Sequence, residues 1–332
     1  MKLAAAVLSL VLTVPGLAQS QTLAPPRLLY PGESPPSVPP PTPTPGSWPA
    51  ADGSDVGLNS PGCGARSTYT GPSTITANNT TIANVNFNGL LRIAADNVTI
   101  SCSDLSDTGG TYGVLVDGSG YGDSIATNFH ITKSRVHDVA TAKELAYRNN
   151  GKGMYITGYS SGTVADYNEF TQSEDGIHSE GSNVLIEHNW IHDLLNSVPG
   201  GPSIHCDALA VSSGNNVMIR NNRFGLFLNN SLSAIMVQPA GGTGTPNNID
   251  IVSNYIDGSP IVGSNVVLLD HQDPPPGVNF CPTGMDLLNN QFGVYGGTAF
   301  NYGSGIKSCT PVSQRGGSCS GNKRIDGTPV GC

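Results

Sequence analysis

Ionisable side chains gather at the beginnings of three apolar strands in the middle of the chain. Asp175 opens the segment DGIHS, in which His178 follows three residues later, and the segment HCDALAV contains His205 and Asp207. Lys152 stands at the corresponding place one repeat earlier. A carboxylate, an imidazole and an ammonium group that converge can move protons to and from a bound molecule. We therefore expect chemistry where these three strands lie side by side.

A repeated motif predicts how these strands are positioned. Residues 183–193 read NVLIEHNWIHD, and related segments begin at Asn97, Asn128, Thr163, Asn216, Asn248 and Gly284. The copies recur at roughly 20 to 36 residues, which is typical of a solenoid. Apolar residues such as Ile186 and Ile191 predict short strands with one buried face, and Asn189 between them suits a tight bend. In stacked coils, the Asn side chains would form a hydrogen-bonded ladder.

A second strand precedes most copies of the motif. These strands begin at Gly153 (GMYITG), Asp175 (DGIHSEG), Asp207 (DALAVSSG), Ser233 (SAIMVQPAGG) and Asn265 (NVVLLDHQD). One coil is thus a strand, a Gly-rich turn, a strand, an Asn bend, a short strand and a variable loop. Over roughly residues 75–300 this order resembles the right-handed parallel β-helix of the pectate-lyase-like superfamily. We expect an all-β, single-domain parallel β-helix of about eight coils with disulfide-stabilised ends.

The resemblance implies that a polysaccharide lies in a groove over the first strand of each coil. Neighbouring coils are about 4.8 Å apart, so Asp175 and Asp207 would be near neighbours if their coils are in register. The predicted catalytic residues are Lys152, Asp175, His178, His205 and Asp207. The predicted substrate-binding residues are Arg148, Tyr155, Glu180, Gln238 and His271. Long loops at 139–152, 194–206, 225–232 and 258–264 would flank this groove.

Three functions could use this set of residues. The first is β-elimination on a uronic-acid polymer, with Lys152, Arg148 or a His as the base and calcium, held by acids such as Asp270 and Asp273, receiving the anionic sugar. The second is glycoside hydrolysis by Asp175 and Asp207. The third is glycan binding without catalysis. We favour the lyase because basic groups and histidines cluster with the acids, while the paired aspartate of polygalacturonase-like enzymes is absent.

The rest of the chain predicts an exported protein. Residues 1–18 read as a signal peptide, 19–50 as a Pro-rich linker and 51–332 as the β-helix domain. No later segment is apolar enough to cross a bilayer. A net charge of −9 without a basic stripe argues against nucleic acid. We expect a secreted or periplasmic monomer.

The seven cysteines fit an oxidising compartment. We expect Cys63 to pair with Cys102 at the front of the solenoid. The residues expected to close the other end are Cys281, Cys309, Cys319 and Cys332. Cys206 is left as the expected free thiol. The histidines expected to be surface polar residues are His137, His188 and His192.

Overall fold

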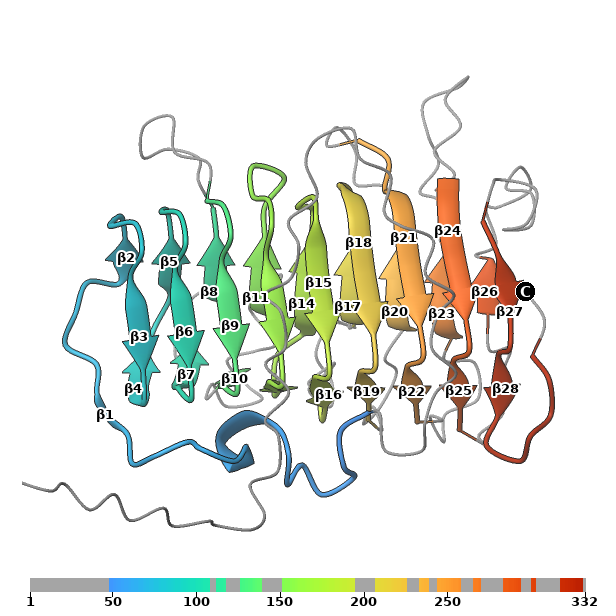
Figure 1. Ribbon diagram of the computed structural model, residues 1–332, viewed down its shortest axis with the longest axis horizontal. Coiled ribbons are helices and arrows are strands. Elements are labelled where there is room, and N and C mark those ends of the chain that lie inside the picture. The colour runs from blue at the N-terminus through green and yellow to red at the C-terminus, as the bar shows by residue number, and fades with distance from the viewer. Residues whose placement is uncertain are drawn as a thin grey trace, which may run out of the picture. The chain divides into compact units, whose positions relative to one another are not determined.

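The computed structural model describes residues 48–107, 112–117, 126–138, 151–194, 207–225, 233–238, 244–257, 265–269, 283–293, 300–302 and 317–330. One compact unit extends from Pro39 to Cys332, and its described part is a parallel β-helix (Figure 1). Three parallel sheets, here named A, B and C, run along the stack. The described part of the chain contains no helix that is long and apolar enough to cross a membrane.

Each coil places one strand in sheet B, then one in sheet C, then one in sheet A. Sheet B contains β2 (Thr74–Ile75), β5 (Leu91–Ile93), β8 (Tyr112–Val116), β11 (Lys152–Ile156), β14 (Asp175–Ser179), β17 (Asp207–Val211), β20 (Ser233–Val237), β23 (Asn265–Leu269) and β26 (Phe300–Tyr302). Sheet C contains β3 (Thr81–Ala83), β6 (Thr99–Ser101), β9 (His130–Thr132), β12 (Val164–Asp166), β15 (Val184–Glu187), β18 (Asn215–Arg220), β21 (Asn247–Val252), β24 (Thr283–Leu288) and β27 (Cys319–Ser320). Sheet A contains β1 (Ser67–Thr68), β4 (Val85–Asn88), β7 (Asp104–Asp107), β10 (Arg135–Asp138), β13 (Glu169–Thr171), β16 (Trp190–His192), β19 (Arg223–Phe224), β22 (Tyr255–Ile256), β25 (Gln291–Phe292) and β28 (Lys323–Arg324). The predicted strand order within each coil is confirmed.

The repeated apolar positions form the core, as predicted. Ile186 of sheet C and Ile191 of sheet A are fully buried, and the corresponding residues of the other copies are buried with them. In the register of the sheets, Ile186 pairs with Ala165 and Ile219, and Ile191 pairs with Phe170. The interior is therefore filled by stacked columns of aliphatic and aromatic side chains.

The predicted Asn ladder lies at the bend between sheets C and A. The Asn222 side chain accepts hydrogen bonds from Asn189 N and Nδ2, and its own Nδ2 donates to Asn254 Oδ1. These three side chains are fully buried. The buried positions of this column are Ser103, Ser134, Asn168, Asn189, Asn222, Asn254, Asn290 and Asn322. The residue before each ladder member, for example His188 with φ +53°, adopts the left-handed conformation that makes the bend.

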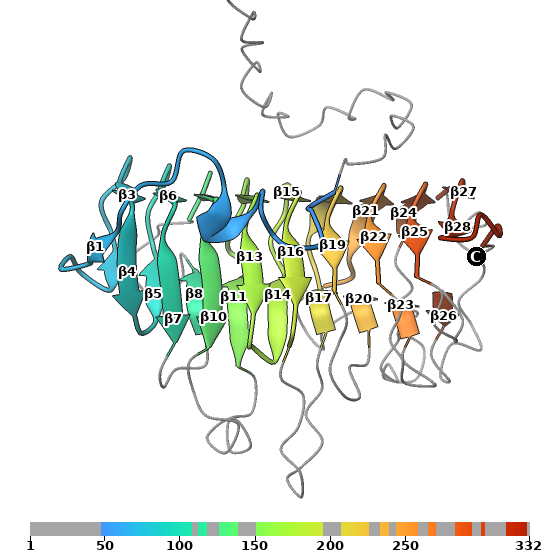
Figure 2. The same ribbon diagram turned by 90° about the horizontal axis from the view of Figure 1, so that it is seen from below.

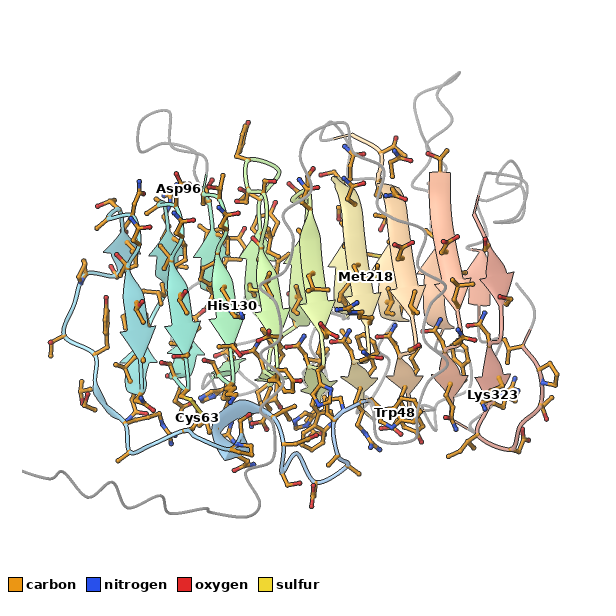
Figure 3. The ribbon with its side chains drawn as sticks, in the orientation of Figure 1. Trp48, Cys63, Asp96, His130, Met218 and Lys323 are labelled. Atoms are coloured by element: carbon orange, nitrogen blue, oxygen red, sulfur yellow. A yellow bond between two sulfur atoms is a disulfide. The ribbon has the colours of Figure 1, made fainter. Side chains whose placement is uncertain are left out.

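A segment before the first coil lies along sheet A. Residues 48–66, the N-terminal strap, contain the 3₁₀ helix η1 (Gly57–Asn59). Trp48 stacks on Tyr255 at one end, and Cys63 is bonded to Cys102 at the other. Figures 1 and 2 show the strap running along the stack, and Figure 3 labels Trp48 and Cys63. The sequence places Trp48 to Ala50 in the linker, but Trp48 packs against a β-helix strand.

The three histidines expected to be surface polar residues all lie against carboxylates, one of them from the strap. His188 Nε2 lies 3.2 Å from Asp55 Oδ2 of the strap. His192 is buried, and its Nε2 lies 3.2 Å from Glu169 Oε1. His137 Nε2 lies 3.1 Å from Asp104 Oδ1, within sheet A. Each imidazole thus has a carboxylate partner.

The predicted disulfide between Cys63 and Cys102 is confirmed. Cys319 is also disulfide-bonded, in agreement with a closed second end. The other cysteines lie outside the described residues. They are Cys206, Cys281, Cys309 and Cys332.

Candidate functional site

In three strands of sheet B, an outward-facing charged residue is followed by a small residue that faces the core. A Cβ on Gly176 would lie 2.5 Å from Ile191 Cγ2 and 2.6 Å from the Ala208 oxygen, so this position faces the core. The next residue, Ile177, is also fully buried. Because side chains alternate along a strand, Asp175, which precedes the inward-facing Gly176, points to the outer face of sheet B. The alternation is interrupted only after Gly176, where Ile177 also faces inward. The same order holds for Lys152-Gly153-Met154 and Asp207-Ala208-Leu209.

The predicted acids and the lysine form one row across neighbouring coils. Lys152 pairs in register with Asp175, and Asp207 pairs with Ser233. Asp175 Oδ1 accepts a hydrogen bond of 3.0 Å from the Asp207 backbone N–H, and its Oδ2 lies 3.5 Å from Lys152 Nζ. Ser233 Oγ donates to Asp207 Oδ1. Asp207 is fully buried and Asp175 nearly so, so this row holds adjacent coils together beneath the surface.

A second, more open row lies beside the first. The rings of Tyr112 and Tyr155 are stacked with centroids 5.1 Å apart, and His178 meets Tyr155 edge-on at 5.1 Å. His178 Nε2 lies 2.8 Å from Ser212 Oγ and 3.9 Å from Glu180 Oε1. Figure 2 shows the strands that carry these residues, β8, β11, β14 and β17, side by side. Aromatic, acidic, imidazole and hydroxyl groups thus meet on the outer face of sheet B.

Burial and charge keep Tyr155 protonated. Burial is the main cause that raises the pKa of its hydroxyl, and the Glu180 carboxylate, which accepts its hydrogen bond, raises that pKa further. Tyr155 is therefore neutral across the physiological range. A hydroxyl with a proton beside an imidazole is a suitable pair for general acid and base catalysis.

His178 links the two rows. Its Nδ1 lies 3.7 Å from Asp175 Oδ2, and its Nε2 faces Ser212 and Glu180. The side chain is 16% exposed, more than either aspartate of the buried row. Among the described residues that the sequence predicted as catalytic, His178 is thus the one most open to a bound molecule.

The structure brings most of the described predicted residues together. Lys152, Tyr155, Asp175, His178, Glu180 and Asp207 lie on three consecutive coils. Gln238 follows β20, two residues beyond Met236, which pairs with Ala210. It is therefore level with Ser212 on the next coil. The remaining predicted residues lie outside the described part of the chain. They are Arg148, His205, Asp270, His271 and Asp273.

Sequence reasoning missed Ser212. It directly follows β17, two residues beyond Ala210, which pairs with His178. An alignment of DALAVSSG with DGIHSEG would have placed Ser212 level with Glu180, and thus next to a groove histidine. The signal was present, but a serine in a Gly-containing turn is usually a turn residue.

The described residues contain no cluster of acidic, histidine or cysteine side chains of the kind that binds a metal ion. No group of three or more His, Cys, Asp or Glu side chains in the described ranges could hold a metal ion. The predicted ligands Asp270 and Asp273 lie outside those ranges.

Comparisons with known proteins concern the fold. An alginate lyase from Paenibacillus sp. str. FPU-7 is 12% identical, with 77% of this chain and 86% of that chain covered and a TM-score of 0.49. The Streptococcus pneumoniae surface protein and adhesin PfbA is 10% identical, with coverages of 80% and 78% and a TM-score of 0.49. The Dettilon tailspike protein is 14% identical, with coverages of 77% and 60% and a TM-score of 0.40. These values carry no information on substrate or reaction.

No curated protein sequence matches this chain. The family model "Right handed beta helix region" matches residues 68–268, more than half of the chain. Those residues include most of the coils of the three parallel sheets described above. The chain therefore belongs to the right-handed β-helix family.

Proposed function

We propose that the outer face of sheet B binds a uronic-acid-containing polysaccharide and cleaves it by β-elimination. The observation that carries the proposal is the contact of Tyr155 with His178 on adjacent coils, beside Glu180. β-Elimination needs a base for the C5 proton, an acid for the leaving oxygen and a charge that stabilises the enolate-like intermediate. Side chains of these three kinds are present on β11 and β14 or directly after them.

The geometry assigns a role to each side chain. His178 Nε2 is the base, because its partner nitrogen Nδ1 faces the Asp175 carboxylate and is the favoured place for the ring proton. Tyr155 is the acid, because burial and Glu180 keep its hydroxyl protonated. Lys152 supplies positive charge one coil away, and its Nζ forms an ion pair of 3.5 Å with Asp175 Oδ2. This ion pair holds the ammonium group at the site, where it can attract a substrate carboxylate.

Glycoside hydrolysis is a second candidate because Asp175 and Asp207 occupy adjacent coils, with one accepting a hydrogen bond from the backbone of the other. Paired carboxylates are the usual means of that reaction. Both are nearly or fully buried, however, and both are held by Lys152 or Ser233. Acid groups that reach a glycosidic oxygen have to be more accessible, so the lyase is favoured.

We propose that the protein acts outside the cytoplasm. Residues 1–18 support export, and the function is then extracellular or periplasmic. We propose a monomer that acts on glycan and has no nucleic-acid or membrane partner. If calcium is required, Asp270 and Asp273 are its proposed ligands, and a chelator should then abolish the activity.

The test is a panel of acidic and neutral polysaccharides incubated with the purified protein. Ultraviolet absorbance of an unsaturated sugar and reducing ends are measured together, with and without chelator. We expect absorbance and reducing ends to rise in step with an acidic polymer. Reducing ends without absorbance would replace the lyase by the hydrolase. Binding of a polysaccharide without either product would show that the protein binds glycan but does not cleave it.

A further inference from the structure

Ser212, His178 and Asp175 form a connected chain of polar side chains on the outer face of sheet B. Ser212 Oγ lies 2.8 Å from His178 Nε2, and His178 Nδ1 lies 3.7 Å from Asp175 Oδ2. Asp175 and His178 belong to β14, and Ser212 directly follows β17 on the next coil. A hydroxyl, an imidazole and a carboxylate in this order are the constellation that activates a serine nucleophile.

The position of the imidazole proton favours this reading. His178 Nδ1 is buried and forms no hydrogen bond within the described part of the chain, and it faces the Asp175 carboxylate. A lone pair on Nδ1 would face that negative charge, so the proton belongs on Nδ1. Nε2 is then the acceptor for the Ser212 hydroxyl proton. The distance from Nδ1 to Asp175 must shorten by about 0.5 Å for a hydrogen bond, a change common between free and substrate-bound sites.

The backbone around Ser212 is held in place. Its N–H donates to the Ser179 oxygen at 2.9 Å. Gly214 has φ +90°, and a Cβ there would overlap the Gly181 oxygen, so the turn after Ser212 requires glycine. Within the described ranges, the Ser213 N–H donates no hydrogen bond. The N–H of the residue after a serine nucleophile is a common donor to the developing oxyanion.

We propose that Ser212 is the nucleophile of an esterase site that removes small O-acyl groups from the glycan. Ser212 is only 4% exposed, which favours a small acyl group such as acetyl over a bulky one. The choice of a glycan as the carrier rests on the proposed function. The esterase chemistry itself rests only on Ser212, His178 and Asp175.

The reaction has two steps. Ser212 Oγ attacks the ester carbonyl carbon while its proton passes to His178 Nε2, and the Ser213 N–H is available to the oxyanion. The tetrahedral adduct collapses, and the sugar oxygen leaves with that proton, so that an acyl-serine and a free sugar hydroxyl remain. Water then gives a proton to His178 and attacks the acyl-serine. The carboxylic acid leaves, and Ser212 recovers its proton.

Covalent labelling tests the nucleophile without any polysaccharide. The purified full chain is incubated with diisopropyl fluorophosphate, and the modified peptide is identified by mass spectrometry. We expect one phosphoryl adduct, on Ser212, absent in Ser212→Ala and retained in Ser160→Ala. Ser160 is a matched control because it is also a buried turn serine, but its Oγ donates to the Val116 backbone oxygen instead of His178. No adduct on wild type, or an adduct elsewhere, would overturn the proposal.

Ester hydrolysis tests turnover. With p-nitrophenyl acetate, we expect Ser212→Ala and His178→Ala each to lose at least 100-fold in kcat/KM, and Ser160→Ala to stay within threefold of wild type. Circular dichroism checks that the variants fold, which we expect because within the described residues the Ser212 side chain forms a hydrogen bond only with His178. Equal rates for Ser212→Ala and wild type would refute the nucleophile. Acetate release from acetylated polymers is measured separately, so that failure of the polysaccharide proposal is distinguishable from failure of the esterase.

Discussion

Replacing Asn222 by alanine should destabilise the β-helix more than a change at any exposed polar position. Asn222 is fully buried at the bend between sheets C and A. The two protons of its Nδ2 are shared among three oxygens within hydrogen-bond distance, Ile186 O at 2.8 Å, Arg220 O at 3.0 Å and Asn254 Oδ1 at 3.1 Å. Its Oδ1 accepts from Asn189 N at 2.9 Å and from Asn189 Nδ2 at 3.0 Å. Alanine would remove all of these interactions.

The magnitude follows from the groups that lose a partner. The backbone N–H of Asn189 and the oxygen of Ile186 lose the partner that Asn222 provides, whereas the Arg220 oxygen keeps its hydrogen bond from the His188 N–H at 3.2 Å. A buried polar group without its partner costs about 1–3 kcal/mol. We expect a loss of about 2–6 kcal/mol in the free energy of unfolding, because both groups lie at a fully buried position. In a domain of this size, this lowers Tm by about 5–15 °C.

Asn216→Gly is the matched control. Asn216 belongs to an exposed amide ladder, in which its Nδ2 donates to Asn183 Oδ1 at 3.0 Å. Its φ is +60°, which glycine adopts without strain. Because water replaces the lost hydrogen bonds, we expect a change of less than about 1 kcal/mol. Urea unfolding followed by circular dichroism compares the two variants with wild type. Equal losses would show that the buried ladder adds no special stability.

Three further predictions concern charge, covalent closure and packing. Burial and then Asp286 raise the pKa of Asp250 from 3.8 to about 6. The folded carboxyl therefore holds its proton more tightly, and its contribution to stability is complete below 3.8 and lost as the pH rises through about 6. At neutral pH, Asp250→Asn should be more stable than wild type by about 1–2 kcal/mol, a figure already reduced for solvent screening. In acid, below the pKa of the unfolded carboxyl, the two proteins should be equally stable. Urea unfolding at neutral and at acidic pH measures the difference. Serine at both Cys63 and Cys102, which are 39 residues apart, should cost about 3–4 kcal/mol and lower Tm, whereas an unchanged Tm would show that the strap is held by packing alone. Gly176→Ala places a methyl group 2.5 Å from a core isoleucine and should cost about 1–3 kcal/mol, whereas wild-type stability would show that the bend in sheet B can relax.

The fold was predictable because its constraints are local and repeated. Each copy of the motif has the same apolar pair around a bend residue, as in Ile186, Asn189 and Ile191. Because stacking gives every copy the same environment, a position that is ambiguous in one copy can be interpreted from the corresponding positions of the others. The strap was not predictable, because residues 48–66 repeat nothing. Trp48, for example, contacts Tyr255 far along the chain.

The site was predictable only in its first row. The register of Lys152, Asp175 and Asp207 follows from aligning the strands that begin each coil. The sequence did not show which of these side chains are sealed off, because burial of Asp207 depends on surrounding structure as well as on its strand. The importance of Ser212 comes from the direction of one hydrogen bond to His178. Such a contact depends on side-chain rotamers, which strand alignment does not specify.

The most direct test of the proposed catalytic face compares two tyrosine variants on an acidic polymer that the wild type cleaves. Tyr155 contacts His178 and Glu180, whereas Tyr159, in the turn after the same strand, is 65% exposed. We measure the initial rate of unsaturated-product formation for Tyr155→Phe and Tyr159→Phe. The account predicts a loss of about 100-fold or more in kcat for the first variant and a wild-type rate for the second. Equal rates for Tyr155→Phe and wild type would contradict the assignment of this face as the catalytic site.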